Sequence, residues 1–318
     1  MPRFDVTIAG ELNLDLILYG LPEPLPPERE VLADRMTLTL GSSSAIVAHN
    51  LAALGSRVGF QSRIGDDPLG QVALDRLAEA GVDVSLVRRT PGPIKSGLTV
   101  ILQHQGGRNI LTYPGTIAEL RASDLDLDYL SSARHFHFSS FYLQSGLRPS
   151  VPELFQKLKA AGLAISLDTN DDPEDRWQGG LREVLRYVDV FLPNVREACR
   201  IAGTDDLESA ITQLAELVPT VVVKTGREGA IAIRDKKKFR SPAVSVTSVD
   251  PVGAGDSFNA GFLHQYIRGA DLLACLAYGN LAGALSTTRP GGTEAFRDRE
   301  YRERFFREHA KSVLAKLS

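Results

Sequence analysis

Two patterns of hydrophobic positions run along the chain. In the first, short β-rich runs alternate with segments of helical spacing, which indicates a mostly parallel sheet with helices on both faces. The runs lie at residues 4–9, 57–63, 135–138, 164–168, 189–192 and 220–224. The helical segments lie near 45–54, 70–80, 150–161, 178–187, 194–202 and 206–217.

The second pattern is an alternation of polar and apolar residues, at 11–19, 31–40, 97–103 and 109–113. Such strands need one solvated face, so they do not fit a buried parallel sheet. We expect them to form a small separate β-sheet, from about residues 11–40 and 95–115. Ligands of open α/β sheets bind at the carboxyl ends of the strands, where such a sheet can serve as a lid.

The last third of the chain predicts a hairpin of strands at 230–233 and 238–246, and then long helices at 253–268, 270–287 and 298–314. The prolines within residues 20–28 exclude regular structure there. No internal repeat divides the sequence. We therefore expect a single domain over residues 1–318, with the lid as its elaboration.

Composition excludes several partners. The 318 residues are 43% hydrophobic, with a formal net charge of -3, whereas proteins that coat nucleic acid or anionic membranes are usually basic. No run of about 18 uncharged apolar residues predicts a membrane span, and the first residues lack the features of a signal peptide. We expect a cytoplasmic protein, with Cys199 and Cys275 as free thiols in apolar helices.

The strongest chemical signal is the segment V-D-P-V-G-A-G-D-S-F at residues 249–258, between a strand-like run and a helical run. Glycines at a helix start allow backbone N–H groups to face an anion, and the helix dipole favours negative charge there. Gly253, Ala254 and Gly255 are thus a candidate cradle for a transferred phosphoryl group. Asp256 follows directly and can accept the proton of an attacking hydroxyl.

This segment has three other interpretations. The glycines can form a simple tight turn, and Asp256 can be an ordinary first-turn acid that complements the dipole. A dinucleotide-binding fingerprint needs glycine where Phe258 stands. A P-loop needs glycine five residues before its lysine, which Lys224 lacks.

Taken with other segments, the motif resembles the C-terminal signature D-T-x-G-A-G-D of the ribokinase-like (PfkB) carbohydrate kinases. Further segments are similar to that family in order and spacing, at residues 10–15, 41–55, 168–170, 194–197, 224–229 and 289–293. The resemblance implies a doubly wound α/β domain with a β-sheet lid. It also implies an ATP-dependent kinase that transfers the γ-phosphoryl group to a hydroxyl of a sugar or sugar-like substrate, with Asp256 as base.

The resemblance further implies the roles of individual residues. The substrate would contact Asn13, Asp15, Gly41, Ser42 and Asn50. The nucleotide would contact Asp168, Asn170, Asn194, Lys224, Gly226, Gly229 and Asn280. Glu197 would hold Mg²⁺ through water, and Asp250 would bind a monovalent cation such as K⁺. Ile46 replaces the family's asparagine, and Asn50 lies one helical turn later, where we expect it to compensate.

Several alternatives stay open at this point. The pair Asn194 and Glu197 also has the spacing of a capping box, and Asp15 can be a turn acid. A nucleoside kinase of the same fold and a non-catalytic sugar-binding regulator are the competing functions. We also expect a homodimer formed partly by the lid, because strands with an exposed apolar face invite pairing with a second copy.

Overall fold

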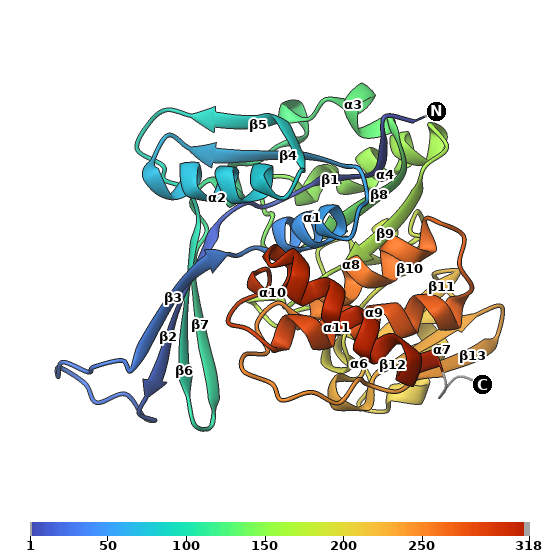
Figure 1. Ribbon diagram of the computed structural model, residues 1–318. Coiled ribbons are helices and arrows are strands. Elements are labelled where there is room, and N and C mark those ends of the chain that lie inside the picture. The colour runs from blue at the N-terminus through green and yellow to red at the C-terminus, as the bar shows by residue number, and fades with distance from the viewer. Residues whose placement is uncertain (1, 315–318) are drawn as a thin grey trace.

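A computed structural model describes residues 2–314 (Figure 1). Its body is a nine-stranded sheet in the order β13-β12-β11-β10-β9-β8-β1-β4-β5. Strand β12 is antiparallel to both of its neighbours, β11 and β13, and all other neighbouring strands pair in parallel. The strands are β1 (Phe4–Ala9), β4 (Val58–Gly65), β5 (Asp83–Thr90), β8 (Ala133–Ser139), β9 (Ala164–Asp168), β10 (Val190–Phe191), β11 (Thr220–Lys224), β12 (Ala230–Arg234) and β13 (Lys237–Ser241). The predicted α/β architecture is confirmed.

The strand order reverses at β1. From β1 the chain forms β4 and β5 on one side, and it then returns to form β8, β9, β10 and β11 on the other side. Connections that leave the carboxyl ends of β1 and β8 therefore diverge in opposite directions. Doubly wound sheets bind ligands at such a reversal.

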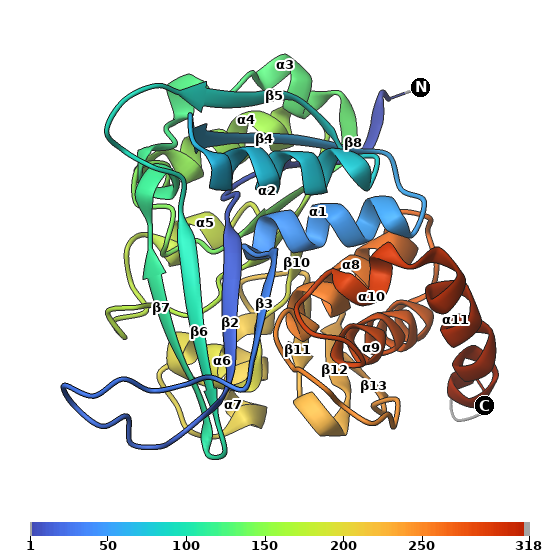
Figure 2. The ribbon, with the colours of Figure 1, turned by 60° about the vertical axis from the view of Figure 1, so that its left-hand side comes forward.

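Helices cover both faces of the sheet, as Figures 1 and 2 show. They are α1 (Ser43–Ala53), α2 (Pro68–Glu79), α3 (Leu127–Ser131), α4 (Val151–Ala160), α5 (Leu181–Leu185), α6 (Val195–Ala202), α7 (Leu207–Ala215), α8 (Ala254–Tyr266), α9 (Leu272–Thr287), α10 (Glu294–Arg297) and α11 (Arg299–Leu314). Successive strand residues supply opposite cores: Val221 and Val223 lie in one, and Val222 lies in the other. Within residues 2–314, no helix is long and apolar enough to cross a membrane.

The lid is a separate four-stranded sheet that extends away from the body (Figures 1 and 2). Its strands are β3 (Arg35–Leu40), β2 (Leu14–Leu21), β6 (Leu98–His104) and β7 (Gly107–Tyr113), in that order across the sheet. The two outer pairs are antiparallel, whereas β2 and β6 run parallel. The small separate sheet expected from the alternating strands is therefore present.

The strand register gives the lid two chemically different faces. Asp15 pairs with Thr39 and Thr99, and Tyr19 pairs with Arg35, so these side chains share what we call the inner face. The inner face is turned toward the body, because the Tyr19 hydroxyl bonds Asp250. The opposite, outer face carries Leu14, Leu16, Leu18, Met36, Leu38, Leu40, Leu98, Val100, Leu102, Leu111 and Tyr113.

Some boundaries differ from the sequence-based expectation. The edge strand β5 was not predicted, and β3 begins at Arg35 rather than residue 31. The strand expected over 238–246 ends at Ser241, and the run before the glycine motif is not a strand. It packs instead through Val244 and Val246 on the core around α9 and α11. The expected domain included residues 1 and 315–318, which lie outside the described residues.

The apolar outer face predicts a homodimer through the lid. It exposes Met36, Leu38, Leu111 and Tyr113. Exposed apolar patches of this kind usually mark an interaction site. Leu38→Asp should convert the dimer to a monomer in light scattering at micromolar concentration. Val72→Asp on α2 is the matched control, because both side chains belong to residues that are 38% exposed. A wild-type monomer would contradict this prediction.

Candidate active site

The carboxyl edge of the sheet gathers polar side chains from several strands. Glu11 follows β1, Ser140 follows β8, Asp168 ends β9 and Lys224 ends β11. Glu11, Ser140 and Asp168 are buried, whereas Lys224 is partly exposed. Parallel strands bring these groups together because their carboxyl ends meet at one edge.

The glycine motif forms the start of α8 at this edge. Gly253 precedes the helix in a left-handed conformation, with φ of 73°. A Cβ atom on Gly253 would lie 2.4 Å from the Cα atom of Gly292, so only glycine permits the contact between these two loops. A Cβ atom on Gly255 would lie 3.6 Å from Lys224 Nζ, which places the lysine ammonium beside the helix start. The region thus combines backbone N–H groups, a helix dipole and one cation.

Asp256 lies in the first turn of α8 and faces this cluster. Burial, followed by the charge of Asp168, raises the pKa of Asp256 to about 6. The ammonium of Lys224 and a hydrogen bond from Ser43 act in the opposite direction. A carboxyl group with such a pKa is mostly ionised at pH 7 and still basic enough to accept a proton.

Asp168 and Lys224 form a buried ion pair beside Asp256. Asn259, three residues after Asp256 on α8, donates its amide to Asp168 Oδ2 at 2.5 Å. Burial alone would lower the pKa of Lys224, but the charges of Asp168 and Glu197 raise it above its ordinary value. The lysine therefore stays cationic among several carboxylates.

Asn194 and Glu197 do form a capping box at the start of α6. The Glu197 amide N–H donates to Asn194 Oδ1 at 2.9 Å, and the Asn194 amide N–H donates to Glu197 Oε2 at 2.8 Å. Glu197 is nevertheless only 5% exposed, and burial followed by the charge of Asp168 raises its pKa to about 7. The pair therefore caps the helix and also adds a carboxylate to the acidic cluster.

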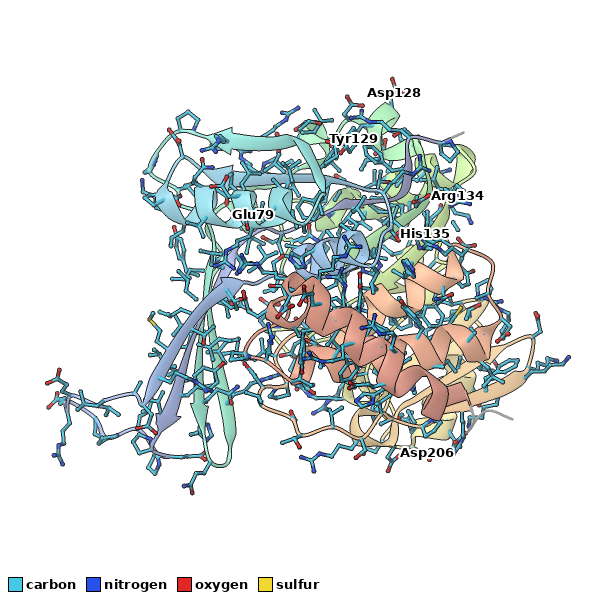
Figure 3. All side chains as sticks on the ribbon, in the orientation of Figure 1. Glu79, Asp128, Tyr129, Arg134, His135 and Asp206 are labelled. Carbon is cyan, nitrogen blue, oxygen red and sulfur yellow. The ribbon has the colours of Figure 1, made fainter. Side chains whose placement is uncertain are left out.

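The lid contributes Asp15 to the same cluster. Asp15 is 6% exposed, and burial followed by the charges of Asp256 and Asp250 raises its pKa to about 7. A Cβ atom on Gly41 would lie 2.0 Å from Asp15 Oδ1, so glycine there makes room for the carboxylate. Asn13 donates its amide to Thr99 Oγ1 at 3.3 Å, and Ser42 caps α1 by accepting from the Ala45 amide N–H at 3.2 Å. Side chains of the lid and of the body extend into the space between them (Figure 3).

Two residues that we expected to contact ligands form hydrogen bonds within the protein. Asn50 is fully buried, and its amide donates to Ser257 Oγ at 2.9 Å and to the Gly292 carbonyl at 3.0 Å. Asn50 thus holds the Gly292 loop against α8, and its expected contact with the substrate stays a prediction. Asn280 donates to the Ser241 carbonyl at 3.0 Å, which ties α9 to the end of β13.

Three other expected residues, Asn170, Gly226 and Gly229, lie at the carboxyl edge. Asn170 has a left-handed backbone, and its amide donates to Ser140 Oγ at 2.9 Å, a residue that is also left-handed. Gly226 and Gly229 flank the short turn after β11, both with positive φ. Left-handed non-glycine residues cost backbone energy and cluster at functional sites.

Glu11 is the main functional candidate that we did not single out from the sequence. Its carboxylate accepts from Ser44 Oγ at 2.6 Å and from the Ser44 amide N–H at 3.1 Å, and burial raises its pKa. Its charge also acts on Asp256. A charged residue directly after a buried strand was the available signal, and for Asn259 the signal was its i, i+3 spacing from Asp256.

The donor set suits Mg²⁺ carried by phosphates. Among the described residues, no group of three or more His, Cys, Asp or Glu side chains is placed to hold a metal ion. Mg²⁺ keeps several waters and takes few protein ligands when it binds with phosphates. Asp168 and Glu197 would hold such an ion through its water ligands.

Comparison with known proteins identifies relatives of this arrangement. The model of the pfkB family of carbohydrate kinases matches residues 3–299. A fructokinase from Klebsiella pneumoniae is 32% identical, over 80% of this chain and 88% of its own. A nucleoside kinase from Methanothermobacter thermautotrophicus is 28% identical, over 89% of this chain and 88% of its own. A solved E. coli structure described as Ribokinase II in complex with ATP and Mg²⁺ has a TM-score of 0.82 and 26% identity, covering 96% of this chain and 100% of that chain.

A lidded, doubly wound sheet with an acidic site at a glycine-led helix start defines a small-molecule kinase of the ribokinase fold. The chain belongs to the pfkB family of carbohydrate kinases, whose model spans nearly its whole length. Within that family it is a sugar or nucleoside kinase.

The acidic cluster predicts a pH-dependent gain in stability for Asp15→Asn. The folded protein holds the pKa of Asp15 near 7, whereas the unfolded chain leaves it near the ordinary value of 3.8. The folded state therefore binds a proton that the unfolded chain releases between these two values, so the free energy of unfolding falls as pH rises toward 7. The variant should therefore raise the free energy of unfolding of the ligand-free protein by about 1–3 kcal/mol at pH 8, and by less at pH 5.

Urea unfolding at the two pH values measures this difference. Asp66→Asn is the control, because the Asp66 side chain is 67% exposed and should give no gain. Destabilisation by Asp15→Asn at pH 8 would show that the carboxylate is not under repulsion.

Proposed function

We propose that the protein transfers the γ-phosphoryl group of ATP to a hydroxyl of a sugar or sugar-like substrate, with Asp256 as the general base. The observation that carries the proposal is the position of Asp256, directly after the glycine-led start of α8 and within the cluster that contains Asp168 and Lys224. ATP with Mg²⁺ supplies the phosphoryl group and neutralises its developing charge.

The roles of the surrounding residues follow from their chemistry. The N–H groups of Ala254, Gly255 and Asp256 are at the helix start, where they can stabilise the charge of the transferred group. Lys224, beside Gly255, adds a positive charge at the same point. Asp256 then removes the proton of the attacking hydroxyl, and the buried cluster excludes water that would otherwise compete.

The inner face of the lid favours a ligand rich in hydroxyl groups. Asn13, Asp15, Thr39 and Thr99 offer one amide, one carboxylate and two hydroxyls close to the body. Carboxylate and amide groups suit adjacent hydroxyl pairs of sugars, and riboses of nucleosides present the same pair. We therefore propose a sugar as the substrate, and a nucleoside is the alternative.

Asp256→Asn should reduce kcat by a factor of roughly 10²–10⁴, which is the rate enhancement that a positioned base usually provides. The fold and ATP binding should be retained, because the amide is isosteric with the carboxyl group. The acid limb of the wild-type rate, expected near the pKa of about 6, should disappear from the residual activity of the variant.

ADP release across a panel of sugars and nucleosides is the measurement, with ATP affinity from calorimetry. Asp205→Asn, at an exposed position before α7, serves as the control and should leave the rate unchanged. Near wild-type turnover of Asp256→Asn would reject the assignment of the base.

Glu197→Gln separates capping from metal binding. Glutamine also completes a capping box, and the variant removes a buried carboxylate that lies close to Asp168, so the melting temperature should be equal to or higher than that of the wild type. The lost charge should raise the Mg²⁺ concentration needed for half-maximal rate, with a smaller effect on sugar affinity. A Mg²⁺ titration at saturating ATP tests this expectation, and an unchanged curve would leave Glu197 with a capping role alone.

A further inference from the structure

Asp250 opens the glycine motif and is fully buried. Its Oδ1 accepts from the Val252 amide N–H at 3.0 Å and from Gln103 Nε2 at 3.3 Å. Its Oδ2 accepts from the Tyr19 hydroxyl at 2.7 Å and from the Gly291 amide N–H at 3.0 Å. Each carboxylate oxygen therefore has two donors.

This donor set does not fit the monovalent cation that the family resemblance implied for Asp250. A cation requires oxygen atoms with free lone pairs, whereas both oxygens of Asp250 are committed to N–H and O–H groups. The same donors direct partial positive charge at the place a cation would take. Burial, followed by the hydrogen bond to Asp250, raises the pKa of Tyr19, so its hydroxyl keeps the proton that it donates.

Two of the four donors belong to the lid. Tyr19 is on β2 and Gln103 is on β6, and both lie on the inner face. Two residues earlier on the same strands, Ile17 and Ile101 pack on Val252, the residue before Gly253. The lid thus contacts the glycine motif through a polar pair and an apolar cluster.

A third strand of the lid contacts the neighbouring glycine loop. Thr39 on β3 donates to Glu294 Oε1 at 2.9 Å and lies 3.4 Å from Thr293 Oγ1. The Gly291 amide N–H joins that loop to Asp250. The lid therefore rests on the two loops whose contact, Gly253 against Gly292, sets the start of α8.

We propose that hydrogen bonds from the Tyr19 hydroxyl and the Gln103 amide of the lid to Asp250 of the body form a latch. The two donors occupy Asp250 in place of a monovalent cation. The latch holds the lid at the distance that brings Asp15 to the start of α8. Tyr19 and Gln103 are positioning residues, because they act through the lid and through Asp250. The inference rests on the proposed site of transfer at Asp256, but its tests are distinct.

The cation half of the proposal is tested on the wild type. Activity in 100 mM KCl, NaCl and tetramethylammonium chloride should agree within about twofold, since an acceptor with four donors offers no cation site. The melting temperature should likewise be the same in the three salts. A fivefold stimulation by K⁺, or a stabilisation specific to K⁺, would overturn this half.

The latch half is tested with Tyr19→Phe, which removes only the hydroxyl. A hydrogen bond to a buried carboxylate is lost, so we expect the KM for the sugar to rise roughly tenfold. The KM for ATP should change little, and ATP hydrolysis without sugar should increase because the site is less well closed. Amide exchange in β2 and β6 should be faster in the ligand-free variant. Gln103→Met should act in the same direction, but more weakly, given its longer contact of 3.3 Å.

Tyr187→Phe is the matched control, because it removes a tyrosine hydroxyl from a partly buried residue after α5, outside the lid. Wild-type sugar KM and amide exchange in Tyr19→Phe would overturn the latch. If Asp256→Asn is inactive while Tyr19→Phe behaves as wild type, the proposed function stands and the latch fails. If Asp256→Asn retains turnover, the site of transfer fails, and the exchange measurement still reports on the latch.

Discussion

Burial of several carboxylates close to one another is the constraint on which the rest of this structure depends. Asp15, Glu197 and Asp256 all have raised pKa values, and burial is the largest cause for each. Lys224 and the dipole of α8 compensate only part of that negative charge. An arrangement of this kind is held by its surroundings at a cost in stability, as is common at functional sites. The rigid parallel sheet and the lid are the elements that hold the groups in place.

Glycines allow these groups to approach one another. Gly41 leaves space for the Asp15 carboxylate, and Gly253 and Gly292 pack Cα to backbone. Asn50 then fixes the Gly292 carbonyl to the start of α8 through its amide. The result is a site in which backbone contacts, rather than long flexible side chains, set the position of the anion-binding N–H groups. That property suits phosphoryl transfer, which depends mostly on positioning and charge stabilisation.

The sequence was informative wherever a pattern is local. The period of the strands separated the lid from the body, and the contiguous motif at residues 249–258 pointed to the start of α8. The edge strand β5 was missed because most of its residues are only partly buried and the alternation is weak. The internal hydrogen bonds of Asn50 could not be foreseen because its partners Ser257 and Gly292 are more than 200 positions away, and Tyr19 and Asp250 are separated by 231 positions. Contacts of this kind follow from the packing of distant loops, which no local spacing encodes.

The alternation of the lid strands also limits how this protein can vary in length. On β2, β3 and β6, odd-numbered residues such as Asp15 lie on the inner face and even-numbered residues such as Leu16 lie on the outer face. A single inserted or deleted residue within one of these strands would exchange the two faces, placing leucines against the ligand and a buried acid in solvent. Substitutions can therefore accumulate on either face independently, whereas changes in length are confined to the hairpin turns. Across the lineage of this chain, the lid should diverge in residue identity while its strand lengths stay constant.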